Sequence, residues 1–517
     1  MIPALIPALI LLPLFAGTLA FFLRGDRGRR VLLVAVPITH AGLVARAWFA
    51  RPLTALGGWL ALDSLELLFL GITSLLTLAA GVYAVGYLAR EKHPRPPAED
   101  GFLFSNAPEA TFTGCFLLFL GTMTLVVASQ HFGLMWVAVE ATTLASAPLI
   151  HFHRNARSLE AAWKYLLICS VGIAIALLGN FFLVVASSSG SGPLTVAGLV
   201  REAGALDPIW LKAAFLLLLV GYGTKMGLAP LHTWLPDAHS EAPSVVSALL
   251  SGALLNCAFL AILRVHSVCV AAGLGAFSGG LLVLFGLVSM GFAAAFIVGQ
   301  ADYKRMLAYS SVEHMGIAAL GVGLGGVAGF GALLHAVNHS LAKAMLFLLS
   351  GNILAVYQDK STARVSGVLR VLPVTGVLWV AGFLAITGTP PFGLFVSEFT
   401  ILKGALDAHR WLVAVLYLVF LTVIFVGMAG IFLRMAFGDR GAAGAQGGLG
   451  TQDAPGTQSG LGTQEERIRP SVAPLKESVL AWLPPLALGI GVLALGLWIP
   501  LPLRDTIHEA LRALGVQ

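Results

Sequence analysis

Ionisable side chains stand inside long apolar segments at several points of this sequence. Lys225 lies in LLLLVGYGTKMGLAPLHTWLPDAHSEAPS, and Glu140 lies in FGLMWVAVEATTLASAPL. A charged group at the centre of a membrane helix costs about 3 kcal/mol on insertion scales, so a functional role is the default expectation. The alternative is a buried ion pair that only fixes helix register, although such pairs stabilise poorly because desolvation offsets their attraction. The two residues therefore indicate proton or ion transfer within a membrane.

A third apolar segment, LLHAVNHSLAKAMLFLL, carries His335, His339 and Lys343. At spacings of four residues they share one helix face and extend over roughly 12 Å along the axis, which suits a proton relay. Two alternatives are a pair of hydrogen-bonded core histidines and zinc binding by histidines at i and i+4. No glutamate follows His335 as in the H-E-x-x-H motif, so we expect no metal here.

Helix breakers accompany these ionisable residues. Pro230 and Pro236 follow Lys225, and VTGVLWVAGFLAITGTPPFGLFVSEFTILK carries glycines and two prolines in mid-membrane before Glu398. An interrupted helix frees backbone carbonyls and leaves room for water beside a titratable group. Two such breaks, five helices apart, are what two internal repeats of inverted orientation would produce. We therefore expect the seventh and twelfth helices to be broken, with Lys225 and Glu398 near the same depth.

The composition indicates which elements must position these residues. Hydrophobic residues make up 58% of the 517 and charged residues 11%, and the mean hydropathy is +0.89. This excludes a soluble protein, and the apolar segments lack the alternation of outer-membrane strands. We expect an all-α polytopic membrane protein with about fourteen transmembrane helices. The segments are 1–23, 31–50, 57–88, 111–129, 132–152, 162–186, 210–230, 243–264, 277–300, 308–326, 329–357, 373–389, 411–438 and 478–500.

The basic residues predict how the helices are oriented. Most of the 31 Lys and Arg residues fall in the odd-numbered loops, which the positive-inside rule assigns to the cytoplasm. Both termini are then on the outer side of the cell inner membrane, and the net charge of +6 needs no nucleic acid to explain it. Residues 1–23 are followed, not preceded, by a basic run, so they are expected to be a first anchor and not a signal peptide.

The four cysteines stand singly in apolar surroundings, with no C-x-x-C spacing. They are expected to be small core residues and not ligands of zinc or an iron–sulfur cluster. With no cysteine cluster and no dinucleotide-binding motif, we expect no cofactor in this chain.

Six stretches of the sequence together carry a family resemblance. They are FGLMWVAVEATTLASAPL, EAAWKYLLICSVGIAIALLG, GTKMGLAPLHTWLPDAHSEAPS, DYKRMLAYSSVEHMG, HAVNHSLAKAMLFLLSGN and TGTPPFGLFVSEF. With these stretches the chain resembles the antiporter-like membrane subunits shared by respiratory complex I, group 4 membrane-bound hydrogenases and Mrp cation/proton antiporters. Within this superfamily WVAVEATTL, SSVEHMG and HSLAKAMLFLLSGN look most like the F component of the hydrogenase-4 complex, with the M component of complex I next.

The resemblance implies two inverted five-helix repeats around a hydrated polar axis along which protons move. It implies that Glu140 and Lys225 form a gating pair and that Glu398 is the terminal site of the twelfth helix. His335, His339 and Lys343 match the central relay of the second repeat. In the eighth helix, Ser251 and Asn256 replace the lysine or histidine that links the two halves in the family. Neither titrates, so they would have to hold bridging water.

These observations divide the chain into five parts. Residues 1–110 hold helices 1–3, residues 111–264 the first antiporter-like repeat, and residues 265–438 the second. Residues 439–475, rich in Gly, Gln and Thr, are expected to be a disordered cytoplasmic loop. Residues 476–517 hold helix 14 and a tail.

The resulting functional hypothesis is a proton-translocating membrane subunit of a respiratory redox complex, of hydrogenase-4 or NADH:quinone oxidoreductase type. Its partners would be other membrane subunits, the lipid bilayer and, indirectly, a peripheral iron–sulfur arm where the electrons are handled. One alternative is an Mrp-type subunit that exchanges sodium for protons. The other is a structural membrane subunit that no longer pumps. This alternative is suggested by Asn256, which cannot titrate.

Overall fold

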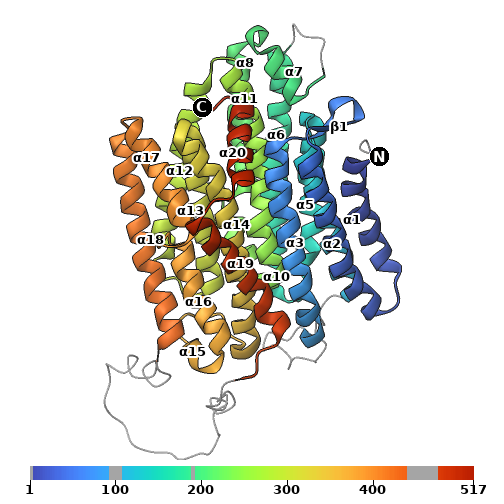
Figure 1. Cartoon of the computed structure of the whole chain (residues 1–517), viewed down its shortest axis with the longest axis vertical. Helices are drawn as coiled ribbons and strands as arrows, with labels where there is room; N and C mark the ends of the chain where they lie inside the picture. The colour runs from blue at the N-terminus through green and yellow to red at the C-terminus, as the bar shows by residue number, and fades with distance from the viewer. Residues whose placement is uncertain (1–3, 92–107, 188–192, 439–474, 517) are drawn as a thin grey trace, which may run out of the picture.

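The protein is a bundle of long helices that run side by side (Figure 1). The computed structural model describes residues 4–91, 108–187, 193–438 and 475–516. Among these, 12 helices are long and apolar enough to cross a membrane. Those that form continuous passages are α1 (Leu5–Phe22), α2 (Asp26–Ala50), α3 (Ser64–Glu91), α4 (Glu109–Ala128), α5 (Phe132–Ile150), α6 (Ala156–Ala186), α12 (Gly275–Ile297), α14 (Gly326–Tyr357), α18 (Trp411–Phe437) and α19 (Val479–Leu497). The helix α13 (Tyr303–Leu324) is not among the 12 and packs between α12 and α14.

Two passages are broken, as the sequence predicted. The first consists of α8 (Pro208–Met226) and α9 (Trp234–Glu241), and the second of α16 (Pro373–Ile386) and α17 (Gly393–Asp407). Gly227 ends α8 at φ 84°, and Gly388 follows α16 at φ 61°, a left-handed conformation that a residue with a side chain rarely adopts. The prediction that helices seven and twelve are interrupted is confirmed, and the all-α polytopic fold is confirmed with it.

A further passage lies at the centre of the bundle. It consists of α10 (Ser244–Leu249), a π-helical turn (η3, Leu250–Leu254) and α11 (Leu255–Ala271). Its most apolar window is 100% buried, because α3, α8, α12 and α14 surround it. Single π-helical turns inside α-helices are frequent at functional sites, and this one holds Ser251. The passage joins the first half of the chain to the second.

The start of the predicted segment 57–88 was wrong by several residues. A β-hairpin, β1 (Leu53–Ala55) and β2 (Leu60–Leu62), precedes α3, with the short turn η1 (Leu56–Gly58) between its strands. Gly57 and Gly58 have φ values of 62° and 90°, which a continuing α-helix cannot contain. The hairpin lies at the upper end of the bundle in Figure 1, which we call the hairpin end.

The short elements complete the chain between these passages. Residues after α19 fold into a further helix, α20 (Leu501–Leu514), where the sequence predicted only a tail. Its buried residues recur every three or four positions, so one face packs on α3, α11 and α14. The remaining short helices are α7 (Val196–Arg201), η2 (Ala203–Ala205) and α15 (Val368–Val371).

The expected division of the chain into five parts stays a prediction, and the elements can be assigned to its two repeat segments. The segment 111–264 contains α4, α5, α6, the broken α8–α9 passage and most of α10–α11. The segment 265–438 contains α12, α13, α14, the broken α16–α17 passage and α18. An inverted symmetry between the two stays a prediction, and the expected loop lies, up to residue 474, outside the described residues.

Candidate functional site

Lys225 lies fully buried near the C-terminal end of α8, immediately before the first helix break. Its Nζ donates hydrogen bonds to Thr143 Oγ1 at 2.8 Å and to Tyr165 Oη at 2.7 Å. It also stands 4.5 Å from the centroid of the Tyr165 ring. The C-terminal end of a helix favours a cation, and Trp234 Nε1 satisfies the nearby Thr224 carbonyl at 2.8 Å. The break thus positions an amino group among hydroxyl groups, and no carboxylate of the described residues contacts it.

Glu140 does not pair directly with Lys225. Its carboxylate accepts a hydrogen bond from Ser170 Oγ at 2.8 Å and another from Thr143 Oγ1 at 3.3 Å. Thr143 therefore connects the predicted gating pair, since its hydroxyl accepts from Lys225 and donates to Glu140. Sequence reasoning had no ground for selecting Thr143 or Tyr165, because threonine and tyrosine are ordinary residues in membrane helices.

Ser251 and Asn256 lie fully inside the bundle between the two halves of the chain. Ser251 Oγ is 2.8 Å from Ser311 Oγ, and Asn256 Nδ2 donates to Ser340 Oγ at 2.7 Å. Asn256 Oδ1 and both ring nitrogens of His339 are buried with no hydrogen-bond partner among the described residues. Buried polar atoms of this kind are normally satisfied by ordered water. This is the chemistry expected of a water-bridged connection.

The three residues predicted as a relay lie on one face of α14, but their hydrogen bonds run through α13 and α17. His335 Nε2 is 3.0 Å from His314 Nδ1, and His335 Nδ1 is 3.0 Å from Ser397 Oγ. The ring of His339 lies 4.9 Å from the His314 ring, centroid to centroid, and 6.4 Å from the His335 ring. His314 therefore bridges the two predicted histidines.

Lys343, two helix turns beyond His335, binds to α13 and not to a histidine. Its Nζ donates to Leu307 O and to Ser310 Oγ, both at 2.6 Å. Glu313 of α13 is buried within electrostatic range of Lys343. Glu313 and His314 were not predicted as site residues from the sequence, although both belong to SSVEHMG in an apolar segment. The same signal that selected the residues of α14, ionisable groups inside a span, would have found them.

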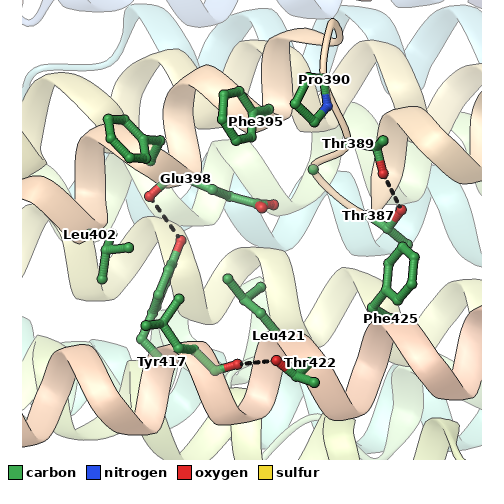
Figure 2. A pocket seen from close by; sticks show the side chains of 13 residues that line it. Thr387, Thr389, Pro390, Phe395, Glu398, Leu402, Tyr417, Leu421, Thr422 and Phe425 are labelled. Carbon is green, nitrogen blue, oxygen red and sulfur yellow. Dashed lines mark hydrogen bonds between the residues drawn. The ribbon is translucent and has the colours of Figure 1, made fainter.

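Glu398 of α17 borders a pocket of about 420 Å³ between the second helix break and α18 (Figure 2). Thr387 and Thr389 from the break line it together with Tyr417 and Thr422 from α18. Glu398 Oε1 is buried without a partner in the described part of the chain. A Cβ at Gly388 would lie 2.0 Å from Glu398 Oε2, so glycine is needed for the carboxylate to occupy this place.

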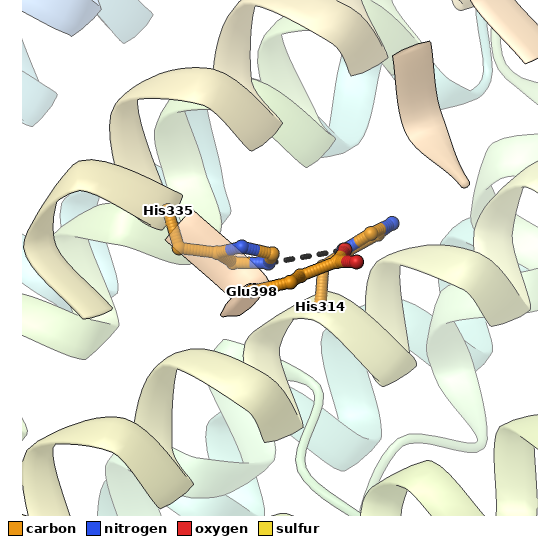
Figure 3. A group of neighbouring side chains, drawn as sticks. All are labelled: His314, His335 and Glu398. Atoms are coloured by element: carbon orange, nitrogen blue, oxygen red, sulfur yellow. Dashed lines mark hydrogen bonds between the residues drawn. The ribbon is translucent and has the colours of Figure 1, made fainter. Parts of the chain in front are cut away.

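Figure 3 shows that His314, His335 and Glu398 converge, with ligand atoms within 4.8 Å of one another. Two imidazoles and a carboxylate could hold a divalent cation. The facing nitrogens of His314 and His335 are hydrogen-bonded to each other, however, so one of them carries a proton. A metal would have to displace that proton, whereas a proton relay uses the hydrogen bond as it stands.

Ion pairs hold the short helix α9 in place. This helix lies at the end of the bundle opposite the hairpin. Asp237 binds Lys164 Nζ at 3.0 Å and Arg305 Nη1 at 2.7 Å, which ties α9 to α6 and to the start of α13. Ser240 Oγ donates to Asp302 Oδ2 at 2.5 Å. The second half of the first broken passage is therefore held by both halves of the chain.

The comparisons with known proteins identify the family. Residues 129–425 match the family described as NADH:quinone oxidoreductase/Mrp antiporter. The chain belongs to this family. A relative from Methylacidiphilum infernorum (isolate V4), the hydrogenase-4 component F homolog, is 38% identical over 376 residues, which cover 71% of this chain and 77% of the relative. The similarity to the F component of hydrogenase-4 that the motifs suggested is thereby confirmed.

A further sequence relative and two solved structures are also similar to this chain. The N component of the NADH-quinone oxidoreductase of Desulforudis audaxviator is 35% identical over 348 residues, covering 66% of this chain and 65% of that protein. A chain of respiratory complex I from Thermus thermophilus superposes with a TM-score of 0.70 at 25% identity, covering 96% of this chain and 97% of that one. A chain of the Mrp complex from Dietzia sp. DQ12-45-1b shares the fold, with a TM-score of 0.81 at 22% identity and 99% coverage of both chains. The protein is thus an antiporter-like membrane subunit.

Proposed function

We propose that this chain translocates protons across the inner membrane as a subunit of a respiratory redox complex of the hydrogenase-4 or NADH:quinone oxidoreductase type. Electron transfer in other subunits would drive the movement. The single observation that carries the proposal is the hydrogen-bonded link from Lys225, buried at a helix break, through Thr143 to the half-buried Glu140. A structural ion pair would bring the two charges together, whereas this arrangement keeps a hydroxyl group between them.

The first step takes place at this link. Lys225 holds a proton on Nζ, stabilised by Thr143, Tyr165 and the nearby carboxylate of Glu140. If Glu140 moves away, the buried ammonium loses a favourable charge and releases its proton; if Glu140 approaches, Lys225 binds one again. Because Thr143 accepts from one residue and donates to the other, a movement of α5 changes both contacts together.

The proton then has to cross the centre of the bundle and reach the second half. Water held by Asn256 Oδ1 and the ring nitrogens of His339 would supply this connection. From there the imidazoles of His314 and His335 accept a proton on one nitrogen and release one from the other. Glu398, beside the pocket at the second break, would exchange the proton with the surroundings.

The face of α5 that carries Glu140 supports a neighbouring membrane subunit as partner. Val137 and Leu144, one turn before and after it on the same face, are 51% and 64% exposed. Glu140 itself is half-buried on this face. A carboxylate facing hydrocarbon would be costly, so a partner helix that covers this face is the reasonable arrangement. The clustering of Lys and Arg in the odd loops supports placing both termini on the outer side.

A second candidate function is exchange of sodium for protons, as in an Mrp-type antiporter subunit. The pocket at Glu398 favours it, because a carboxylate and the hydroxyls of Thr387 and Thr389 are oxygen ligands of the kind that hard cations prefer. The third possibility is a subunit that no longer pumps. It is suggested by Asn256, whose side chain cannot titrate.

One experiment distinguishes the three. The native complex containing this chain is purified and reconstituted in liposomes, and proton uptake is followed during electron transfer with and without sodium. A redox pump moves protons in both media, an antiporter moves them only against sodium, and a structural subunit leaves proton movement unchanged when Lys225 is replaced. Absence of any redox subunit from the purified complex would contradict the main proposal.

A further inference from the structure

A second group of charged residues lies at the hairpin end of the bundle, apart from the site described above. Arg264 of α11 and Glu66 of α3 form an ion pair at 3.0 Å, and their side chains are 2% and 3% exposed. Gln130 Nε2 donates to the same Glu66 oxygen at 2.9 Å. Asp63 is half-buried, and its backbone N–H donates to the other Glu66 oxygen at 3.4 Å. The group thus extends from the interior to the surface.

The two carboxyl groups of this cluster are suited to exchanging a proton. Asp63 lies just outside the membrane span of α3, and burial, followed by the charge of Glu66, raises the pKa of its carboxyl group. Two carboxyl groups in contact titrate as a pair and tend to share one proton, since like charges disfavour ionising both. The pair can therefore take up a proton from one side and return it to the other.

Three unpartnered buried polar atoms lie on α11, α6 and α8, the helices that surround Lys225 and the ion pair. They are Arg264 Nε, Asn180 Oδ1 and Tyr222 Oη, none of which has a hydrogen-bond partner among the described residues. Tyr222 lies beside Asn180 and within electrostatic range of Arg264. It also precedes Lys225 by three residues, so the two share a face of α8. Atoms of this kind bind water, so we expect ordered water in the region between the two charged groups.

The spacing along α11 supports the same expectation. Cys257 lies within electrostatic range of both Lys225 and Arg264. It precedes Arg264 by two helix turns on the same face, a rise of roughly 10 Å. The distance from the Lys225 site to the ion pair is therefore short enough for a few water molecules to cover.

A purely structural role explains only part of this arrangement. Arg264 Nη1 donates to Val126 O at 3.0 Å and its Nη2 contacts Val127 O, so the guanidinium satisfies carbonyls in the last turn of α4. That contact accounts for the two Nη atoms. The contact between Asp63 and Glu66 also caps the first turn of α3, since Asp63 Oδ1 accepts from Leu65 N at 3.0 Å. The structural role leaves unexplained the unpartnered Nε of Arg264.

We propose that Asp63, Glu66 and Arg264 form a proton-exchange site that gives Lys225 access to the membrane surface at the hairpin end. The inference rests on the proposed function, because it supplies the proton of Lys225 with a route inside the first half of the chain. A proton leaves the Lys225 ammonium, passes along water held by Tyr222 and Asn180, and binds the Glu66 carboxylate. Asp63 receives the proton and releases it to bulk water. Meanwhile the hydrogen bonds to the α4 carbonyls hold the Arg264 guanidinium in place.

The test uses the native complex in liposomes and measures proton uptake per electron transferred. Glu66→Gln keeps an oxygen that accepts from Arg264 and Gln130 but removes the titrating group, and Asp63→Asn does the same at the surface. Both are expected to lower proton uptake about tenfold or more. The matched control is Glu109→Gln, which removes the carboxylate from the Arg30–Glu109 ion pair at the other end of α4 and should leave uptake unchanged.

Lys225→Ala is measured in parallel to separate this inference from the proposed function. If Lys225→Ala lowers uptake while assembled Glu66→Gln and Asp63→Asn match the wild type, the proton-exchange site is refuted and the proposed function stands. If Lys225→Ala has no effect, the proposed function itself fails. Where Glu66→Gln prevents assembly by leaving Arg264 unbalanced, the half-buried Asp63→Asn decides: reduced uptake supports the site, and wild-type uptake overturns it.

Discussion

Thr143 stands between Lys225 and Glu140, accepting a hydrogen bond from the lysine at 2.8 Å and donating one to the glutamate at 3.3 Å. The two ionisable residues come from α8 and α5, and the hydroxyl group keeps them from forming an ion pair. A direct buried ion pair would hold both charges in a deep energy minimum. The intervening hydroxyl leaves Lys225 free to change its protonation when α5 shifts.

Replacing this hydroxyl tests the link directly. Thr143→Val keeps the volume of the side chain but can neither accept from Lys225 nor donate to Glu140. Leaving a buried donor unsatisfied costs about 1–3 kcal/mol, so proton uptake should fall roughly tenfold or more. The control is Thr142→Val, since the neighbouring hydroxyl donates only to Val139 O of its own helix. Equal uptake in the two variants would contradict the link.

Glu140 should require a carboxylate and tolerate some displacement of it. Glu140→Gln keeps the contacts with Ser170 and Thr143 but cannot carry the charge that stabilises the Lys225 ammonium, so uptake should fall about tenfold or more. Glu140→Asp retains a carboxylate about one methylene farther away and should keep partial activity. Proton uptake in liposomes compares the two; identical rates for Gln and Asp would refute the gating role.

Asn256 tests whether water connects the two halves of the chain. Asn256→Leu has a similar volume and removes the unpartnered oxygen, so it should lower proton uptake. Asn256→Lys should assemble normally if the site is hydrated, whereas an unpaired charge in a dry layer would cost several kcal/mol and reduce the yield of complex. The measurements are complex yield in detergent and proton uptake in liposomes. Normal assembly and wild-type uptake in the leucine variant would show that no proton passes this residue.

Glu398 should be needed at the far end of the relay. Glu398→Gln removes the titrating group beside the pocket and should lower proton uptake about tenfold or more without loss of the helix break, which Gly388 and the prolines determine. Asp407→Asn, on the same helix, is the control, because Asp407 is exposed and pairs with Lys403 on the surface. Wild-type uptake in Glu398→Gln would remove this residue from the pathway.

The sequence predicted the helices and both breaks because their signals are local. An apolar stretch long enough for the bilayer must be helical, and prolines together with glycines at positive φ interrupt it at Gly227 and Gly388. The same reasoning selected Lys225, Glu140, Glu398 and the residues of α14, because an ionisable residue inside an apolar segment can be recognised from the sequence alone. In the structure Lys225, the residues of α14 and Glu398 are buried inside the bundle, whereas Glu140 is half-buried on a partly exposed face of α5.

What the sequence could not predict depends on which helices are neighbours. Thr143 matters only because α8 brings Lys225 against it, and Tyr165 only because α6 packs on the same helix. The relay through His314 requires α13 to lie beside α14, a contact that spacing within α14 does not reveal. The helix α20 was missed because its polar face lowers the average hydropathy that identifies a membrane span.

Lys225→Ala in the assembled complex tests the central claim most directly. The measured quantity is the number of protons taken up per electron transferred, compared with the wild type and with Lys225→Arg, which keeps the charge but cannot release its proton. Because Thr143 and Tyr165 remain to bind water, the complex should assemble in both variants. The account predicts a sharply reduced ratio for alanine and for arginine alike. An unchanged ratio in an intact Lys225→Ala complex would contradict it.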